Sequence, residues 1–204
     1  MVARSTEQYI RSNVAGFHIE DQVQTKRCGH LEGKELVNTE VFLSRIRAAK
    51  AARQKQRSDI VIIARTDALQ KYGYDESIAR LKAAKEAGAD VGFLEGITSK
   101  EQARQAVKDM HPFPLLLNMV EHGATPTIGV DEARDMGFRI MIFPFAALAP
   151  AYTAIKKGLE KLKTGGVMGT GKELTPRMLF EVCGLEASIE IDAKAGGKAF
   201  EKWA

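Results

Sequence analysis

Apolar residues are concentrated in five short runs, and amphipathic segments separate most of these runs from one another. Each run is continuous rather than alternating, which is typical of a strand buried on both faces of a parallel sheet. The five runs are Val14–Glu20, Asp59–Thr66, Val91–Gly96, Leu115–Val120 and Arg139–Phe145. This repeated order of strand and helix predicts an α/β domain whose strands all point the same way.

The segments between the runs have helical spacing and recognisable ends. The stretch NTEVF begins with a capping residue, TSKEQ has the pattern of a capping box, and the glycines of EAGAD and DMGFR end helices. The N-terminal MVARSTEQYIRSN has the pattern of a helix interior and lacks the apolar region of a targeting peptide. The predicted helices are Thr39–Gln56, Asp75–Ala87, Ser99–Met110 and Val130–Met136, followed after the last strand by Ala147–Leu162 and Pro176–Cys183.

Polar residues gather where the predicted strands end. Because the carboxyl ends of parallel strands share one rim, these side chains should lie close together. That rim carries the ligand site both in a (β/α)₈ barrel and in a doubly wound sheet. The sequence therefore predicts a small-molecule site at the rim. The rim residues are Glu20, Asp21, Arg65, Asp67, Glu95, Asn118 and Glu121, with Pro144 after the last strand.

Charge and cysteine content narrow the class of protein. The 204 residues carry 30 basic and 26 acidic side chains in an interspersed pattern. The most basic segment, Arg47–Arg57, has the spacing of a solvated helix face rather than a nucleic-acid arm. Two cysteines do not make a disulfide framework, so a reducing compartment is expected. Apolar runs of this length are too short to span a membrane. We therefore expect no nucleic-acid or membrane partner.

Cys28 lies in a cationic segment just after the first predicted strand. Lys26, Arg27 and His30 lie within two residues of it, and nearby cations make a thiol more acidic. Gly29 allows close approach of the backbone to a ligand. The alternative is a small apolar residue with incidental basic neighbours. The loop position favours a functional thiol.

The other rim residues have two interpretations each. Glu20 can bind a hard divalent cation or form an ion pair with Lys26 or Arg65. Arg65 can bind a substrate carboxylate through two hydrogen bonds or pair with a rim carboxylate. Glu95 and Asn118 can bind a ligand or belong to a structural network. Their convergence on one rim favours a site. His18, on the same strand face as Glu20, can orient this cluster or be a core histidine with its own partners, and the first role is expected. Asp67 is expected to be a cap or loop anchor.

The segments HIEDQ, KRCGHLEGKELV, RIRAA and IARTDA resemble the isocitrate lyase/phosphoenolpyruvate mutase superfamily. The later segments GAD, FLEG, LLLNMVE and FPFAALAPAYTAI continue this resemblance. The C-terminal LFEVCGLEASIEIDAKAGGKAF is most similar to the fungal branch with oxaloacetate hydrolase and dimethylmalate lyase. The resemblance covers essentially the whole chain.

This resemblance implies a (β/α)₈ barrel, a homodimer or homotetramer that exchanges its C-terminal helix, and a cofactor of Mg²⁺, with Mn²⁺ as the alternative. The implied substrate is a small 2-hydroxy or 2-oxo dicarboxylate. By motif match, Cys28 donates a proton to the enolate product, and Lys26, Gly29 and His30 belong to the gating loop. Lys26 and His30 are the other expected catalytic residues. Glu20 matches the metal-site carboxylate. Cys28, Gly29, Arg65, Glu95 and Asn118 match substrate-binding positions.

The chain also departs from the family pattern. It offers five strands where the barrel has eight, so we expect residues 1–204 to be a single partial barrel domain that lacks the first three strands, with 165–204 as a helical extension. A fragment, a truncated gene model and a genuine short form all fit this pattern. For residues 1–204 alone we expect weak or no binding of Mg²⁺ and low activity. The expected location is cytoplasmic, or mitochondrial or peroxisomal if a native N-terminus precedes Met1.

The stretch FPFAALAP after the last predicted strand bears on the substrate. It lacks the arginine that commonly holds the extra carboxylate in methylisocitrate lyases, and it lacks the serine associated with oxaloacetate hydrolases. The favoured function is a Mg²⁺-dependent carbon–carbon lyase acting on a substituted malate, such as a 2,3-dimethylmalate. Oxaloacetate acetylhydrolase and methylisocitrate lyase are the enzymatic alternatives. A catalytically silent barrel that serves as an oligomerisation partner is the alternative without enzymatic activity.

Overall fold

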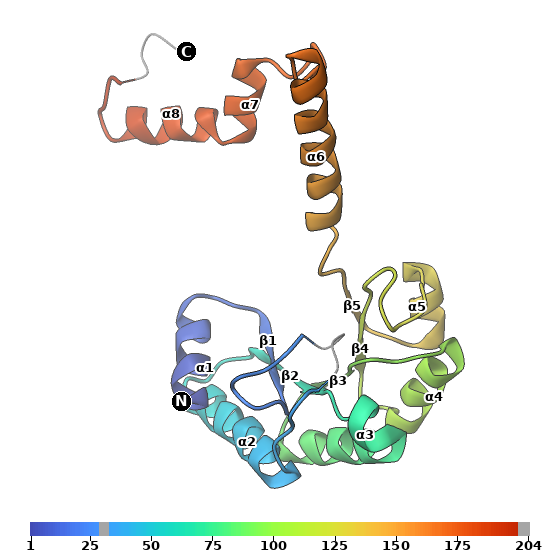
Figure 1. The fold of residues 1–204 in the computed structure, drawn as a ribbon. Coiled ribbons are helices and arrows are strands. Elements are labelled where there is room, and N and C mark those ends of the chain that lie inside the picture. Colours follow the sequence, from blue (N-terminus) through green and yellow to red (C-terminus); the bar gives the residue numbers. More distant parts are fainter. Residues whose placement is uncertain (29–32, 200–204) are drawn as a thin grey trace. The chain divides into compact units, whose positions relative to one another are not determined.

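The structure is a computed structural model that describes residues 1–28 and 33–199 (Figure 1). The chain divides into two compact units, Met1–Ala146 and Ala147–Ala204. The first unit contains a sheet of five parallel strands in the order β1-β2-β3-β4-β5. The strands are β1 (Gly16–Glu20), β2 (Val61–Thr66), β3 (Val91–Leu94), β4 (Leu115–Asn118) and β5 (Ile140–Ile142). The predicted α/β fold with parallel strands in sequence order is confirmed.

Five helices belong to the first unit. The caps follow the sequence: Asn38 accepts a hydrogen bond from the Val41 amide at 2.8 Å, and Gly88 and Gly137 end their helices with positive φ angles of 116° and 102°. The capping box is only half formed, since Ser99 accepts from the Gln102 amide whereas the Gln102 side chain accepts from Thr98. The helices are α1 (Val2–Arg11), α2 (Thr39–Lys55), α3 (Leu69–Ala87), α4 (Lys100–Met110) and α5 (Val130–Met136).

Helix α3 begins earlier than the predicted Asp75. Its first turn starts at Leu69, and a kink follows at Gly73, whose φ of 83° and ψ of −178° are accessible almost exclusively to glycine. The regular amphipathic pattern starts beyond this kink, so the sequence pattern located only the second part of the helix.

The two faces of the sheet pack differently. Ile62 and Ala64 of β2 and Leu115 and Leu117 of β4 belong to a large core that also contains residues of the helices. The alternate strand residues form a smaller cluster on the other face, which we call the inner face. This cluster consists of Val91, Phe93 and Leu116, with Val61, Ile63, Ile140 and Ile142 packed against it. Polar residues occupy the carboxyl end of the inner face.

The second unit consists of α6 (Leu148–Gly165), α7 (Pro176–Val182) and α8 (Leu185–Lys194). Gly166 ends α6 with a φ of 72°, and the Thr175 hydroxyl caps α7 by accepting from the Met178 amide at 3.2 Å. Helix α8 lies within the expected helical extension 165–204, but its bounds were not predicted from the sequence. None of the described helices is long and apolar enough to cross a lipid bilayer. The expected single domain, with an extension from residue 165, stays a prediction.

Candidate active site

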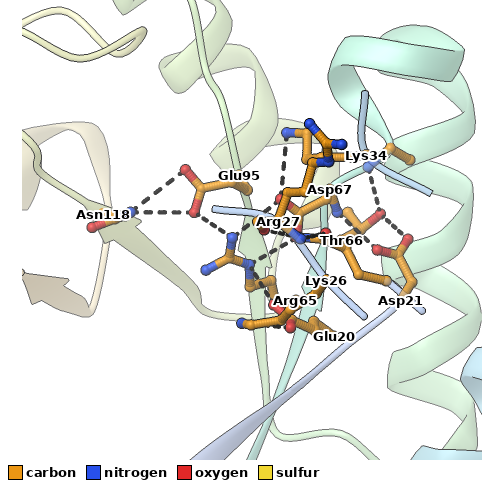
Figure 2. Close-up of polar contacts among 12 residues, drawn as sticks. Glu20, Asp21, Lys26, Arg27, Lys34, Arg65, Thr66, Asp67, Glu95 and Asn118 are labelled. Atoms are coloured by element: carbon orange, nitrogen blue, oxygen red, sulfur yellow. Dashed lines mark hydrogen bonds and ion pairs between the residues drawn. The ribbon is translucent and has the colours of Figure 1, made fainter. Parts of the chain in front are cut away.

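Four of the predicted site residues meet at the carboxyl ends of neighbouring strands. Glu20 is the last residue of β1, and its register partner on β2 is Arg65. Glu95 directly follows β3, and Asn118 is the last residue of β4. All four side chains lie in one chain of polar contacts (Figure 2). The structure therefore brings together the rim residues on which the predicted site depends.

Arg65 is the centre of this cluster because its guanidinium contacts three carboxylates. Its Nε and Nη2 donate to the two Asp67 oxygens at 2.9 Å and 3.1 Å. Nη2 also lies 3.2 Å from Glu95 Oε2, and Nε lies 3.3 Å from Glu20 Oε2. Burial by itself would lower the pKa of Arg65, but hydrogen bonding and negative charge from Asp67, followed by Glu95 and Glu20, raise it. The guanidinium therefore stays charged although it is largely buried.

One nitrogen of Arg65 remains available. Among the described residues, no hydrogen-bond acceptor pairs with Nη1, and the Phe93 ring supports the guanidinium from below with its centroid 4.9 Å from Cζ. Asn118 presents the complementary group. Its Nδ2 donates to Glu95 Oε2 at 3.2 Å, whereas its buried Oδ1 has no partner among the described residues. The rim thus offers an unpaired charged donor and an unpaired acceptor.

The Asp67 carboxylate binds two cationic side chains below the rim. It is completely buried and accepts from both Arg65 and Lys34, whose Nζ is 3.4 Å from Asp67 Oδ1 (Figure 2). Burial alone would raise the pKa of Asp67, but Arg65 lowers it most strongly, with further contributions from Lys34 and Gln22. The sequence predicted a loop anchor here, and Asp67 does connect β2 to the segment that contains Lys34.

A second buried network lies beside the first. Asp21 Oδ2 accepts from the Thr66 hydroxyl at 2.6 Å and from Arg80 Nη1 at 3.2 Å, and Oδ1 accepts from the Asp67 amide at 2.9 Å. Desolvation raises the pKa of Asp21 despite these contacts. The sequence analysis named Asp21 but missed Thr66 and Arg80. An arginine on the buried side of α3 is the one signal that could have suggested a partner for a buried carboxylate.

The Cys28 segment is tied to the rim through its neighbours. Lys26 Nζ lies 2.6 Å from Glu20 Oε1, and the Arg27 backbone makes two hydrogen bonds with the Gln22 side chain at 3.1 Å. Cys28 itself is a free, exposed thiol. Gly29 and His30 lie outside the described residues, so their predicted roles remain predictions.

His18 lies on the same face of β1 as Glu20 and contacts the Phe93 ring edge to face, with centroids 5.9 Å apart. Desolvation and the positive charge of Arg65 lower the pKa of His18. This histidine is therefore biased towards the neutral form, in the layer directly below the rim.

The described residues only partly fit a magnesium site. Glu20 Oε2 is buried and accepts no hydrogen bond from any described residue, although Arg65 Nε is 3.3 Å away. No group of three or more histidine, cysteine or acidic side chains within residues 1–28 and 33–199 is arranged to hold a metal ion. Mg²⁺ usually keeps several waters and takes one or two protein carboxylates. Glu20 fits as one such ligand, and the described side chains do not complete a coordination sphere.

The chain is similar to a known protein family and to solved structures of related enzymes. The sequence profile of the phosphoenolpyruvate phosphomutase family matches residues 1–163. A crystal structure of 2,3-dimethylmalate lyase is 67% identical, with a TM-score of 0.95 over 98% of this chain and 66% of that chain. A structure of oxaloacetate acetylhydrolase with the inhibitor 3,3-difluorooxalacetate is 61% identical, with a TM-score of 0.93 over 98% of this chain and 67% of that chain.

A curated relative, the 2-methylisocitrate lyase of Aeropyrum pernix, is 36% identical over 98% of this chain and 64% of its own length. The chain thus spans about two thirds of the length of these relatives.

Proposed function

The chain belongs to the phosphoenolpyruvate mutase/isocitrate lyase superfamily, and from this membership we propose that it supplies the catalytic rim of a carbon–carbon lyase. The substrate class we propose is a small 2-hydroxy dicarboxylate of the substituted-malate type. Among the relatives, one is named as a lyase of 2,3-dimethylmalate, which is a 2-hydroxy dicarboxylate of this class. The others are named for 2-methylisocitrate, a hydroxy tricarboxylate, and for oxaloacetate, a 2-oxo dicarboxylate.

One observation carries this proposal: Arg65 Nη1 and Asn118 Oδ1 are both unpaired among the described residues at the same rim. A hydroxy acid satisfies both, because its carboxylate accepts from the guanidinium and its hydroxyl donates to the amide oxygen. Arg65 is oriented by Asp67 before any ligand arrives, so little further ordering is needed on binding. Glu95 keeps both Arg65 and Asn118 in place.

The reaction we propose uses this arrangement. The substrate hydroxyl gives its proton to water, the C2–C3 bond breaks, and C2 becomes the carbonyl carbon of a 2-oxo acid. The electron pair of the broken bond passes to C3 and its carboxylate as an enolate. The Cys28 thiol, with Lys26 and His30 as its neighbours in the sequence, then delivers a proton to C3, and water returns a proton to the thiolate. A 2,3-dimethylmalate would give pyruvate and propionate without consuming water.

Magnesium, or manganese in its place, is part of the proposal. Glu20 is the described residue that would hold the ion, directly or through a water. A bound ion would stabilise the negative charge that develops on the substrate oxygens. Arg65 and Lys26 contribute positive charge at the same place in this chain, since both contact Glu20.

The residues after β5 favour a dicarboxylate over a tricarboxylate. Residues 143–146 read FPFA and contain no cation that could bind a third carboxylate. They also contain no serine, which favours the lyase reaction over hydrolysis of oxaloacetate. Oxaloacetate acetylhydrolase remains the second candidate because a solved structure of that enzyme is 61% identical.

Exchange of C-terminal helices between copies remains our proposal for assembly. Phe180 and Val182 of α7 and Ile191 of α8 are large apolar side chains that are exposed in the chain, and a second copy would cover them. Light scattering of the purified protein would test this. A monomer at micromolar concentration would contradict it.

The test of function is a substrate screen of the purified protein with and without Mg²⁺. The substrates are 2,3-dimethylmalate, 2-methylisocitrate and oxaloacetate, and NMR identifies the products. We expect pyruvate and propionate from 2,3-dimethylmalate. Oxalate and acetate from oxaloacetate alone would support the second candidate. The absence of turnover with all three substrates would overturn the enzymatic proposal and favour the catalytically silent barrel.

A further inference from the structure

The Gln22 side chain binds the backbone of the segment that carries the cysteine. Its Nε2 donates to the Arg27 carbonyl at 3.1 Å, and its Oε1 accepts from the Arg27 amide at 3.1 Å. The Arg27 carbonyl belongs to the peptide bond that joins Arg27 to Cys28. A single buried carboxamide therefore holds both main-chain polar groups of the residue before the thiol, as a neighbouring strand would do.

The backbone at Gln22 is itself held by hydrogen bonds. Arg45 Nη1 donates to the carbonyls of both Glu20 and Gln22 at 2.8 Å. Gln22 also forms an isolated antiparallel bridge with Leu36, and the Asp21 carbonyl accepts from the Val37 amide at 2.8 Å. The bridge joins the two ends of the segment between Gln22 and Leu36, which contains Cys28. The Gln22 side chain therefore extends towards Arg27 from a backbone that is itself hydrogen-bonded.

The backbone that carries Gln22 is also connected to the substrate-binding side of the rim. Asp21, the residue before Gln22, accepts from the Asp67 amide at 2.9 Å. Asp67 in turn orients Arg65 through two hydrogen bonds. Residues 21 and 22 therefore link the segment that carries the proposed proton donor to the carboxylate that orients the proposed substrate-binding cation.

We propose that Gln22 is a positioning residue that fixes the Arg27–Cys28 peptide, so that the Cys28 thiol has a defined position relative to a substrate bound at Arg65. This inference rests on the proposed function, in which Cys28 protonates the product enolate. Gln22 does not touch the substrate. Proton transfer to carbon depends steeply on distance and direction, so a loosened thiol should slow the chemical step more than substrate binding.

The first test replaces Gln22 by methionine, which has a similar length but cannot form either hydrogen bond. We expect Gln22→Met to lower kcat by about 10-fold to 100-fold and to change KM by less than about threefold. Gln24→Met is the matched control, because Gln24 is an exposed glutamine two residues further along the same segment. It should leave both constants unchanged. Equal kcat values for Gln22→Met and the parent would overturn the inference while leaving the proposed function intact.

A second variant covers the case in which Gln22→Met does not fold. Gln22→Glu keeps an oxygen opposite the Arg27 amide but places a second oxygen against the Arg27 carbonyl. Protonation of this carboxyl restores an O–H donor to that carbonyl. We therefore expect kcat of Gln22→Glu, relative to the parent at each pH, to rise as the pH is lowered from 8 to 5.5. A flat ratio would contradict a positioning role for this hydrogen bond.

A third measurement needs no turnover. In a Cys183→Ser background, Cys28 is the one remaining cysteine, and its alkylation by iodoacetamide can be followed with and without oxalate and Mg²⁺. We expect oxalate to slow alkylation in the parent and to give little protection in Gln22→Met, and we expect calorimetry to give the same oxalate affinity for both proteins. A parent that oxalate does not protect would remove Cys28 from the site and overturn both proposals. Equal protection in the two proteins would overturn the role of Gln22 alone.

Discussion

The carboxylate of Asp67 binds the guanidinium of Arg65 through two hydrogen bonds, with Oδ2 at 2.9 Å from Nε and Oδ1 at 3.1 Å from Nη2. This pairing uses one edge of the planar guanidinium and leaves Nη1 unpaired among the described residues. A buried arginine is thereby oriented towards the rim by a buried carboxylate two positions later in the sequence.

Replacement of Arg65 by lysine should therefore not be conservative. A lysine cannot bind Asp67 through two parallel hydrogen bonds and at the same time present a free donor to a substrate. We expect Arg65→Lys to lower kcat/KM by about 100-fold or more. Arg47→Lys is the control, since the Arg47–Glu40 ion pair is exposed on α2. Steady-state kinetics would contradict the assignment if the two variants lost similar activity.

Replacement of Cys28 by serine tests the proton donor. A serine hydroxyl is a much weaker acid than a thiol and should not protonate the enolate at a useful rate. We expect Cys28→Ser to abolish lyase turnover while oxalate binding, measured by calorimetry, persists. Cys183→Ser, on the second unit, should retain full activity. Turnover at the parental rate by Cys28→Ser would remove this thiol from the mechanism.

Replacement of Phe93 by alanine tests the support beneath the rim. Phe93 is fully buried on the inner face, contacts the His18 ring and lies under the Arg65 guanidinium. Loss of its ring leaves a cavity and should lower the free energy of unfolding by about 3–5 kcal/mol. Val130→Ala, at a position that is 52% exposed at the start of α5, should change it by less than about 0.5 kcal/mol. Urea denaturation measures both, and similar losses would show that Phe93 is not a core residue.

The lowered pKa of His18 predicts how stability depends on pH. Because the folded state holds His18 neutral below the unfolded value of about 6.5, the unfolded state binds the proton more readily. Stability should therefore fall as the pH drops below about 6.5 towards the lower pKa of the folded state. His18→Gln should show a shallower decrease in melting temperature between pH 7 and pH 5. Parallel decreases in the parent and the variant would place the titrating group elsewhere.

The strands were predictable because each reads as an apolar run. The expected burial on both faces is found for β3 and β4, which are buried at every residue, whereas β1, β2 and β5 are partly exposed. Their ends were less well predicted. Met119 and Val120 are buried although β4 ends at Asn118, so the apolar run continues into a loop that packs in the core. The kink at Gly73 was missed for a different reason, since it depends on backbone angles that the hydrophobic pattern does not express.

The candidate site was likewise predicted only in part from the sequence. Glu20, Arg65, Glu95 and Asn118 could be grouped from the sequence because parallel strands bring their carboxyl ends to one rim. The partners of these residues could not. Lys34 reaches Asp67 across 33 positions, and Arg80 reaches Asp21 across 59. The two hydrogen bonds between Gln22 and the Arg27 backbone likewise correspond to no periodic pattern in the sequence, so they could not be predicted from it.

By itself, the sequence determined that this chain forms a parallel α/β sheet with a polar rim, since strands that pack on both faces of a sheet carry apolar residues at consecutive positions and leave a continuous pattern. The tertiary structure alone decided which charged groups are paired, which atoms of Arg65 and Asn118 remain unpaired, and how the backbone next to Cys28 is held. These features depend on the distances and angles between single polar atoms, and such geometry exists only once distant segments have packed together.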